Sequence, residues 1–237
     1  MLIESYYREN NGIISFTRQQ GSDFAKNIAD DFNPLHDIDA KRFCIPGDLL
    51  FSLVLAKYGI SQHMQFTFSG MVTEQSLLNL PSDSEALHIK DTQDKEYLSI
   101  KKSGASSHNS DFIDSLTRSY VTFSGHTFPH ILQPLLQQQQ VMINPDRPMV
   151  IYESMLIDLD RLDINSVDLQ INKDKTRFDL NGKRGNVCLA FTLIADSEEV
   201  GRGEKNMVLS GLKPYQQDVV DSLVTGYNER KASYRDR

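Results

Sequence analysis

Apolar residues occupy nearly every position from Leu49 to Ala56, and Ser52 alone interrupts the run. Pro46 precedes it, and proline is well tolerated in a first helical turn, so the pattern predicts a helix that begins near Gly47. A helix that is apolar on all sides is normally enclosed by other elements instead of lying on a surface. We therefore expect this helix to form the centre of the first half of the chain.

Segments typical of β-strands surround this helix along the sequence. They are His63–Val72, Ala86–Lys90, Glu96–Lys101 and Phe112–Phe123 in the first half, and Met149–Leu159, Val167–Asn172, Thr176–Leu180, Val187–Ala195 and Lys205–Leu209 in the second. The small residues of Gly104–Asn109 indicate a loop. We expect an antiparallel sheet to wrap around the central helix.

Three further helices are predicted. Ser22 can cap a helix over Asp23–Asp30, and a second helix covers Phe128–Gln140. A C-terminal helix follows Pro214, with its apolar residues on one face. The residues Asn228–Arg237 indicate a charged tail with no assigned chemistry.

The two halves of the chain resemble each other. Met64–Val72 aligns with Met149–Ile157, and Val121–Gly125 aligns with Met207–Gly211 at nearly the same offset. Two matches at one offset suggest a duplicated unit. We predict an α+β fold of two fused units, each a helix wrapped by an antiparallel sheet, at residues 1–125 and 126–237, with the C-terminal helix in the second.

The formal net charge of −7 argues against a nucleic-acid partner, because a phosphate backbone requires a basic face. The two cysteines, Cys44 and Cys188, lie among apolar residues and are expected to be buried free thiols. No segment has the length and apolarity of a membrane span, and the first residues lack the apolar region of a secretory signal. These features predict a cytoplasmic globular protein.

An acid and a histidine stand five residues apart across a turn. Asn33-Pro34 forces a corner that can bring the Asp31 carboxylate and the His36 imidazole to one side. Two such groups can hold a water molecule and exchange protons with it near neutral pH. The N–H groups at Gly47, where the apolar helix starts, can stabilise a negatively charged oxygen. A turn that only shapes the backbone is the competing interpretation, because Asp and Asn commonly bond their own backbone.

The segment Asp31-Phe32-Asn33-Pro34-Leu35-His36 resembles the Asp-x-Asn-Pro-x-His signature of the R-specific enoyl-CoA hydratases, the MaoC-like dehydratases. The segment Gly47–Leu53 is similar to the Gly-x-Leu start of that family's central helix. The resemblance covers about Phe24 to Leu55. It implies the hotdog fold, a helix wrapped by an antiparallel sheet, and the suspected duplication then implies a double hotdog.

The resemblance also implies a reaction, the reversible hydration of a trans-2-enoyl thioester. Asp31 and His36 would position and activate the water, and Asn33 with Pro34 would shape the turn. The backbone N–H of Gly47 would polarise the thioester carbonyl, with Asn33 and Gly47 forming the substrate-binding part of the site. Coenzyme A or an acyl carrier would enter as part of the substrate. No separate cofactor or metal is expected, and a homodimer is compatible with this interpretation.

Three features depart from the family pattern. The segment between His36 and Gly47 is several residues shorter than is usual in the family. Pro46 stands where a histidine often precedes the helix glycine, and Asp48 places a negative charge in the first helical turn. That charge suits the helix dipole, but it would oppose an oxyanion if the side chain points inward. The second unit lacks the Asp-x-Asn-Pro-x-His motif, so one site per chain is expected.

Two other functions remain open. A non-catalytic hotdog protein would bind acyl thioesters or a protein partner and keep the turn for structural reasons. An acyl-CoA thioesterase on the same fold would use a differently placed acid. Cys44 as a nucleophile is a weaker candidate, because a cysteine between apolar residues usually belongs to the core.

Overall fold

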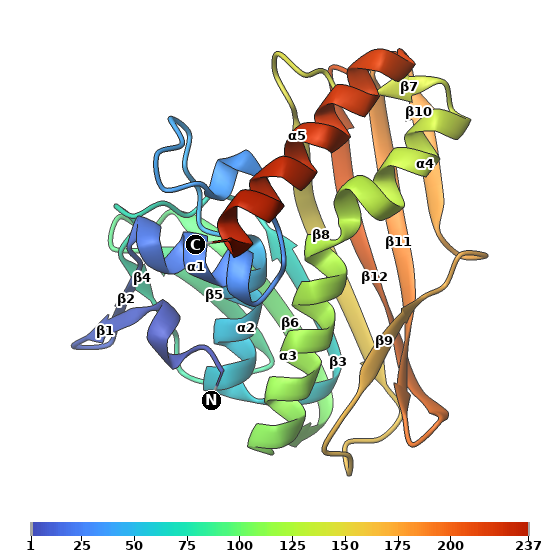
Figure 1. The fold of residues 1–237 in the computed structure, drawn as a ribbon. Coiled ribbons are helices and arrows are strands. Elements are labelled where there is room, and N and C mark those ends of the chain that lie inside the picture. The colour runs from blue at the N-terminus through green and yellow to red at the C-terminus, as the bar shows by residue number, and fades with distance from the viewer. Residues whose placement is uncertain (1, 237) are drawn as a thin grey trace.

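The computed structural model describes residues 2–236, and its main feature is one large antiparallel sheet with helices packed against it (Figure 1). The strand order is β1-β2-β4-β5-β6-β3-β8-β12-β11-β10, and β9 pairs with β11. The strands of this sheet are β1 (Arg8–Asn10), β2 (Ile13–Ser15), β3 (Ile60–Phe68), β4 (Leu78–Asn79), β5 (Ala86–Asp91), β6 (Glu96–Ser107), β8 (Val150–Leu159), β9 (Asp168–Ile171), β10 (Arg177–Asn181), β11 (Arg184–Ala195) and β12 (Glu198–Ser210). A second, two-stranded sheet pairs β7 (Val141–Met142) with β13 (Lys213–Pro214).

The helices are η1 (Glu4–Tyr6), α1 (Arg18–Asn27), η2 (Pro34–His36), α2 (Gly47–Tyr58), α3 (Ser110–Gly125), η3 (Thr127–Ile131), α4 (Leu132–Gln138) and α5 (Gln217–Arg235). None of the helices within residues 2–236 is long and apolar enough to cross a membrane.

Helix α2 confirms the prediction of an enclosed central helix. All residues from Asp48 to Leu55 are buried, and Phe51 packs edge-on against Phe66 of β3. Pro46 occupies the N-cap position, and Gly59 ends the helix with a φ of 74°, a conformation that favours glycine. Full burial of each large apolar side chain stabilises the fold by about 2 kcal/mol, so α2 anchors the core.

Helix α3 overturns the strand predicted at Phe112–Phe123. Asn109 caps the helix, with its Oδ1 accepting a hydrogen bond from Asp111 N at 2.9 Å. Phe112, Leu116 and Tyr120 then fall on one buried face at helical spacing. Strand β6 runs on to Ser107, so the predicted loop at Gly104–Asn109 is wrong over most of its length.

The α+β double hotdog class is confirmed, because α2 and α3 lie side by side against one continuous antiparallel sheet (Figure 1). Strands β3 and β8 pair in the middle of that sheet, with Met64 opposite Ile157. The first repeat match lies largely in these two strands. The second match is wrong, because Val121–Gly125 is helical whereas Met207–Gly211 lies mostly in β12. The division into residues 1–125 and 126–237 stays a prediction.

Two helix starts differ from the sequence-based prediction. Helix α1 begins after Thr17, whose hydroxyl and backbone exchange hydrogen bonds with Gln20, whereas the predicted cap Ser22 lies buried inside the helix. The helix predicted over Phe128–Gln140 is divided into η3 and α4, with non-helical backbone at Phe128. Helix α1 starts at the capping box of Thr17 and Gln20, because these reciprocal bonds satisfy two N–H groups that would otherwise be unpaired.

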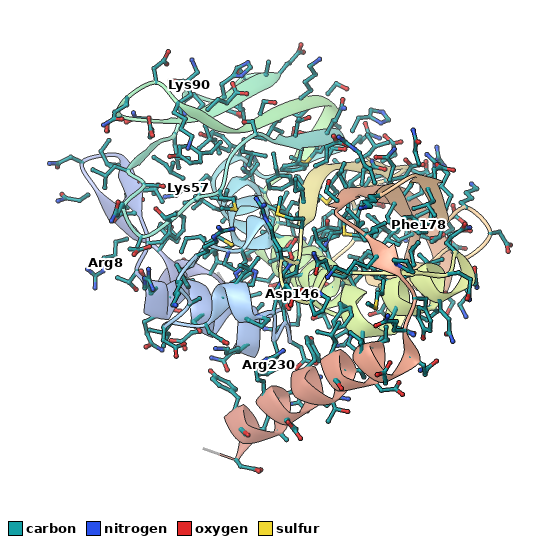
Figure 2. The ribbon with its side chains drawn as sticks, turned by 90° about the horizontal axis from the view of Figure 1, so that it is seen from above. Arg8, Lys57, Lys90, Asp146, Phe178 and Arg230 are labelled. Carbon is teal, nitrogen blue, oxygen red and sulfur yellow. The ribbon has the colours of Figure 1, made fainter. Side chains whose placement is uncertain are left out.

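Helix α5 continues to Arg235, so most of the predicted charged tail is helical; residue 237 lies outside the described residues. The helix runs from the end of the molecule near α4 and β7 down toward α1 (Figure 1). Figure 2 shows it from above, with Arg230 on the stretch that passes the α1 side. Its residues Tyr227 and Tyr234 pack edge-on against Phe32, so α5 covers the Asp31–His36 turn.

Candidate active site

The turn after α1 is held by its own side chains. Asp31 Oδ1 accepts a hydrogen bond from Asn33 N at 2.8 Å, and Asn33 Oδ1 accepts one from Leu35 N at 3.1 Å. Pro34 begins the short helix η2, which ends at His36. Asn33 and Pro34 therefore have the shaping role expected of them. A contact of Asn33 with substrate stays a prediction.

Asp31 and His36 converge as the sequence predicts. The His36 Nδ1 lies 2.8 Å from the Cys44 carbonyl oxygen, and because a carbonyl only accepts, this nitrogen donates. The other ring nitrogen, Nε2, therefore faces the carboxylate, 3.7 Å from Asp31 Oδ2. That separation is too long for a direct hydrogen bond and lets one water molecule contact both groups.

Electrostatics favour a charged His36. Burial lowers the pKa of His36, but the hydrogen bond to Cys44 and the nearby Asp31 carboxylate outweigh it and raise that pKa to about 9. Burial also raises the pKa of Asp31, although His36 and the bond from Asn33 N act in the opposite direction. At neutral pH the pair therefore combines an imidazolium, which can give a proton, with a carboxyl group that accepts one when ionised.

We expect the protein to lose stability as the pH rises from about 6.5 to about 9, because His36 has the higher pKa in the folded state. The stabilisation from this group is fully present below the unfolded-state value and is lost as the pH passes through the folded-state value. It amounts to at most about 3 kcal/mol. Urea unfolding of the parent and of His36→Gln across this range measures the difference. Parallel profiles for the two proteins would contradict the assignment.

Gly47 is the first residue of α2, and two aromatic rings pack against it. A Cβ at this position would lie 3.2 Å from Tyr152 Cδ1 and 3.3 Å from Phe68 Cε1. The segment that enters α2 also carries Cys44, whose carbonyl holds His36, so the histidine lies beside the helix start. The first N–H groups of α2 carry partial positive charge. The use of the Gly47 N–H as an oxyanion donor stays a prediction.

A buried polar cluster at the start of α2 was missed by sequence analysis. Asp48 Oδ2 accepts a hydrogen bond from Ser124 Oγ at 2.5 Å, and Lys205 Nζ donates to the same Ser124 oxygen. The Lys205 Nζ also lies 4.5 Å from the centroid of the Tyr152 ring, whose hydroxyl bonds the Tyr120 hydroxyl. Asp48 therefore points inward, but Lys205 offsets its negative charge.

Ion pairs with Asp30 hold helix α5 over the turn. The Asp30 carboxylate pairs with Lys231 and with Arg235 at 2.9 Å, and His126 Nε2 lies 2.7 Å from the same carboxylate. Burial alone would raise the pKa of Asp30, but the bonds from Lys231 and His126 outweigh burial and lower it. The Tyr227 hydroxyl adds a contact of 3.3 Å to Phe32 N. The candidate site is thus shielded by the C-terminal helix.

A groove with a volume of about 540 Å³ runs along α3 and β9. It is lined by Arg118, Ser119, Thr122, Phe123, His126, Ile131, Asp168, Leu169 and Ile171. His126 belongs both to this groove and to the Asp30 ion pairs, so the groove opens beside the turn. Asp31, His36 and Gly47 are not among its lining residues.

Both cysteines are buried free thiols, which confirms the expectation from their apolar surroundings. The Cys44 Sγ lies 3.9 Å from the His36 nitrogen that already bonds the Cys44 carbonyl. Within residues 2–236, no group of three or more His, Cys, Asp or Glu side chains is arranged to hold a metal ion.

Comparison with solved structures finds matches at low sequence identity. An acyl-CoA thioesterase II, TesB2, from Mycobacterium marinum shares 10% sequence identity and a TM-score of 0.45, covering 91% of this chain and 100% of that chain. The CurJ dehydratase, an H978F inactive mutant, shares 11% identity with a TM-score of 0.40, covering 86% and 95%. A bifunctional dehydratase-cyclase domain in ambruticin biosynthesis shares 8% identity with a TM-score of 0.38, covering 90% and 94%.

Among curated proteins, none matches the sequence. A family model does match, over residues 1–218, and this range contains every helix and strand before α5 together with the Asp31–His36 turn and the buried Lys205 cluster. The chain therefore belongs to the family described as "Protein of unknown function (DUF3581)".

Proposed function

We propose that this protein catalyses the reversible hydration of a trans-2-enoyl thioester, as the MaoC-like dehydratases do. The observation that carries the proposal is the convergence of Asp31 Oδ2 and His36 Nε2 at 3.7 Å, with the other histidine nitrogen bonded to the Cys44 carbonyl. This bond sets the ring orientation, so the reactive nitrogen faces the carboxylate. A turn that only shaped the backbone would need the hydrogen bond to Asp31 Oδ1, but it would not need Asp31 Oδ2 to face His36 Nε2.

In the proposed reaction, Asp31 takes a proton from water while the water oxygen bonds C3 of the enoyl group. The electron pair of the double bond moves toward the thioester carbonyl, and C2 then takes a proton from the His36 imidazolium. The proton on Asp31 then returns to His36, which restores both groups, and elimination of water follows the same steps in reverse. The N–H of Gly47 and the positive end of α2 stabilise the charged carbonyl oxygen.

The thioester carrier, coenzyme A or an acyl carrier protein, is part of the substrate. The groove along α3 supports an approach from that side, because His126 connects it to Asp30, the residue before Asp31. The acyl chain would then enter along α3, beside the turn. A homodimer remains a prediction.

We expect the purified protein to consume crotonyl-CoA, seen as a loss of the enoyl absorbance, without release of free thiol. Measurement of both signals separates the three candidate functions. A thioesterase would be identified by two results together: thiol release from a saturated acyl-CoA, and no loss of the enoyl absorbance in a separate assay with crotonyl-CoA. Binding of crotonyl-CoA with neither signal would identify a non-catalytic acyl-thioester protein and would overturn the proposed reaction.

A further inference from the structure

Lys205 is a buried lysine in an interior that is otherwise mainly apolar. Its relative exposure is 5%, and that of Asp48 is 8%. Removing two such charges from water costs several kcal/mol for each ion, and a pair of this kind is often no more stabilising than apolar residues of similar volume. Stability alone therefore does not explain why Lys205 and Asp48 are buried together. Their position in the molecule suggests another role.

The ammonium group lies next to the start of α2. One face of the Tyr152 ring carries the Lys205 Nζ, 4.5 Å from its centroid, and an edge of the same ring packs against Gly47. Lys205 and the first turn of α2 thus flank one aromatic side chain. The Lys205 ammonium and the N–H groups at the start of α2 therefore place two sources of positive charge next to the same side chain.

Asp48 and Ser124 hold Lys205 in this position. Ser124 Oγ donates to Asp48 Oδ2 at 2.5 Å and accepts from Lys205 Nζ, so the hydroxyl bridges the two charges. Within residues 2–236, the second Asp48 oxygen, Oδ1, is buried without a hydrogen-bond partner. An unpaired buried acceptor is costly, so the burial of Asp48 calls for an explanation other than stability.

The same cluster adjoins Asp31. Gly125 follows Ser124 at the end of α3, and a Cβ on Gly125 would lie 3.2 Å from Asp31 Cβ. Burial lowers the pKa of Lys205, and the Asp48 and Asp31 carboxylates oppose that shift by favouring its charged form. Lys205 is therefore linked to Asp31 through Ser124 and Gly125, and to Gly47 through the Tyr152 ring.

We propose that Lys205 is a catalytic residue whose ammonium stabilises the negative charge that develops on the thioester carbonyl oxygen. This inference rests on the proposed hydration reaction. The lysine donates a hydrogen bond and transfers no proton: charge arrives on the oxygen as water attacks C3 and leaves when C2 is protonated. Asp48 acts as a positioning residue, through Ser124, and its charge is compensated instead of opposing the oxyanion.

The test compares Lys205→Met with the double variant Lys205→Met/Asp48→Asn. The single variant leaves Asp48 buried and unpaired, so we expect it to lose both stability and activity. The double variant removes both charges, and we expect it to recover most of the thermal stability. Its kcat on crotonyl-CoA should still be reduced about 10²-fold, because an oxyanion donor is missing. A purely structural ion pair predicts the recovery of both properties in the double variant.

Lys102 provides a control with the same residue types. It is buried, pairs with Asp83 at 2.5 Å and lies 5.8 Å from the centroid of the Tyr58 ring at the other end of α2. Replacing Lys102 with Met and Asp83 with Asn removes a second lysine–aspartate pair away from the site, one in which the lysine is buried and the aspartate side chain is 57% exposed. This control should hydrate crotonyl-CoA within about threefold of the parent rate, since it leaves the oxyanion donors in place.

Acetoacetyl-CoA gives a measurement on the unmodified protein, because its enolate carries the charged oxygen that Lys205 is proposed to bind. We expect binding to increase the enolate absorbance, and the double variant to lose the increase. Binding without any enolate increase, or a double variant with the parent kcat, would overturn the role of Lys205 alone. A parent protein that fails to hydrate crotonyl-CoA would overturn the hydration reaction and, with it, this inference.

Discussion

Asp31→Asn should reduce kcat for crotonyl-CoA hydration by about 10³-fold or more in a protein that still folds. The amide oxygen can still accept the hydrogen bond that Asn33 N gives to Asp31 Oδ1 at 2.8 Å, so the turn keeps its shape. The variant lacks the carboxylate that takes the proton from water. Steady-state kinetics and urea unfolding of the same preparation measure the two effects.

Asp37→Asn is the matched control for this substitution. Asp37 directly follows His36, but its carboxylate pairs with Lys26 at 2.8 Å, away from the histidine ring. We expect its activity to stay within about twofold of the parent, since the Asp37 carboxylate pairs with Lys26 and takes no part in the proposed reaction. If Asp31→Asn instead unfolds the protein and the folded fraction keeps the parent activity, Asp31 has only a structural role in the turn.

The secondary structure was predictable where the local sequence pattern is compatible with only one type of element. Helix α2 is apolar on all sides and has Pro46 at its start, and no strand of a half-exposed sheet produces that pattern. Helix α3 was mistaken for a strand because Phe112, Ile113, Tyr120 and Val121 are residue types that favour strands. Tertiary packing and the Asn109 cap override that preference.

The candidate site likewise has one part that the sequence predicts and one part that it does not. Asp31 and His36 are close in sequence, and the Asn33-Pro34 corner brings them together, so a local motif was sufficient to propose the pair. Lys205 meets Ser124 and Asp48 only through the packing of β12, α3 and α2, which no local motif encodes.

One signal for Lys205 is nevertheless present in the sequence. Lys205 occupies the same face of β12 as Met207 and Leu209, which are buried. A charged residue on the apolar face of a strand is costly and therefore indicates a buried partner. The partner itself follows only from the three-dimensional structure.

Gly125→Ala should destabilise the protein by about 3 kcal/mol or more, although alanine normally stabilises a helix relative to glycine. A Cβ at this position would lie 1.9 Å from the Ala29 carbonyl oxygen and 2.8 Å from the Ala29 carbonyl carbon. Both are backbone atoms and cannot rotate away, so the end of α3 and the turn must separate. Urea unfolding measures this loss of stability.

The same substitution should lower hydration in the molecules that remain folded. The separation moves Asp31 away from Ser124 and the start of α2, and small displacements of catalytic groups cost large factors in rate. Gly226→Ala is the control, because in α5 the added Cβ meets only Arg230 Nη1, at 3.7 Å, and should stabilise the protein by about 0.5–1 kcal/mol. Equal stability gains at both positions would show that α3 and the turn do not approach as closely as described. A destabilised Gly125→Ala protein with an unchanged kcat would show that this contact supports the fold without positioning Asp31.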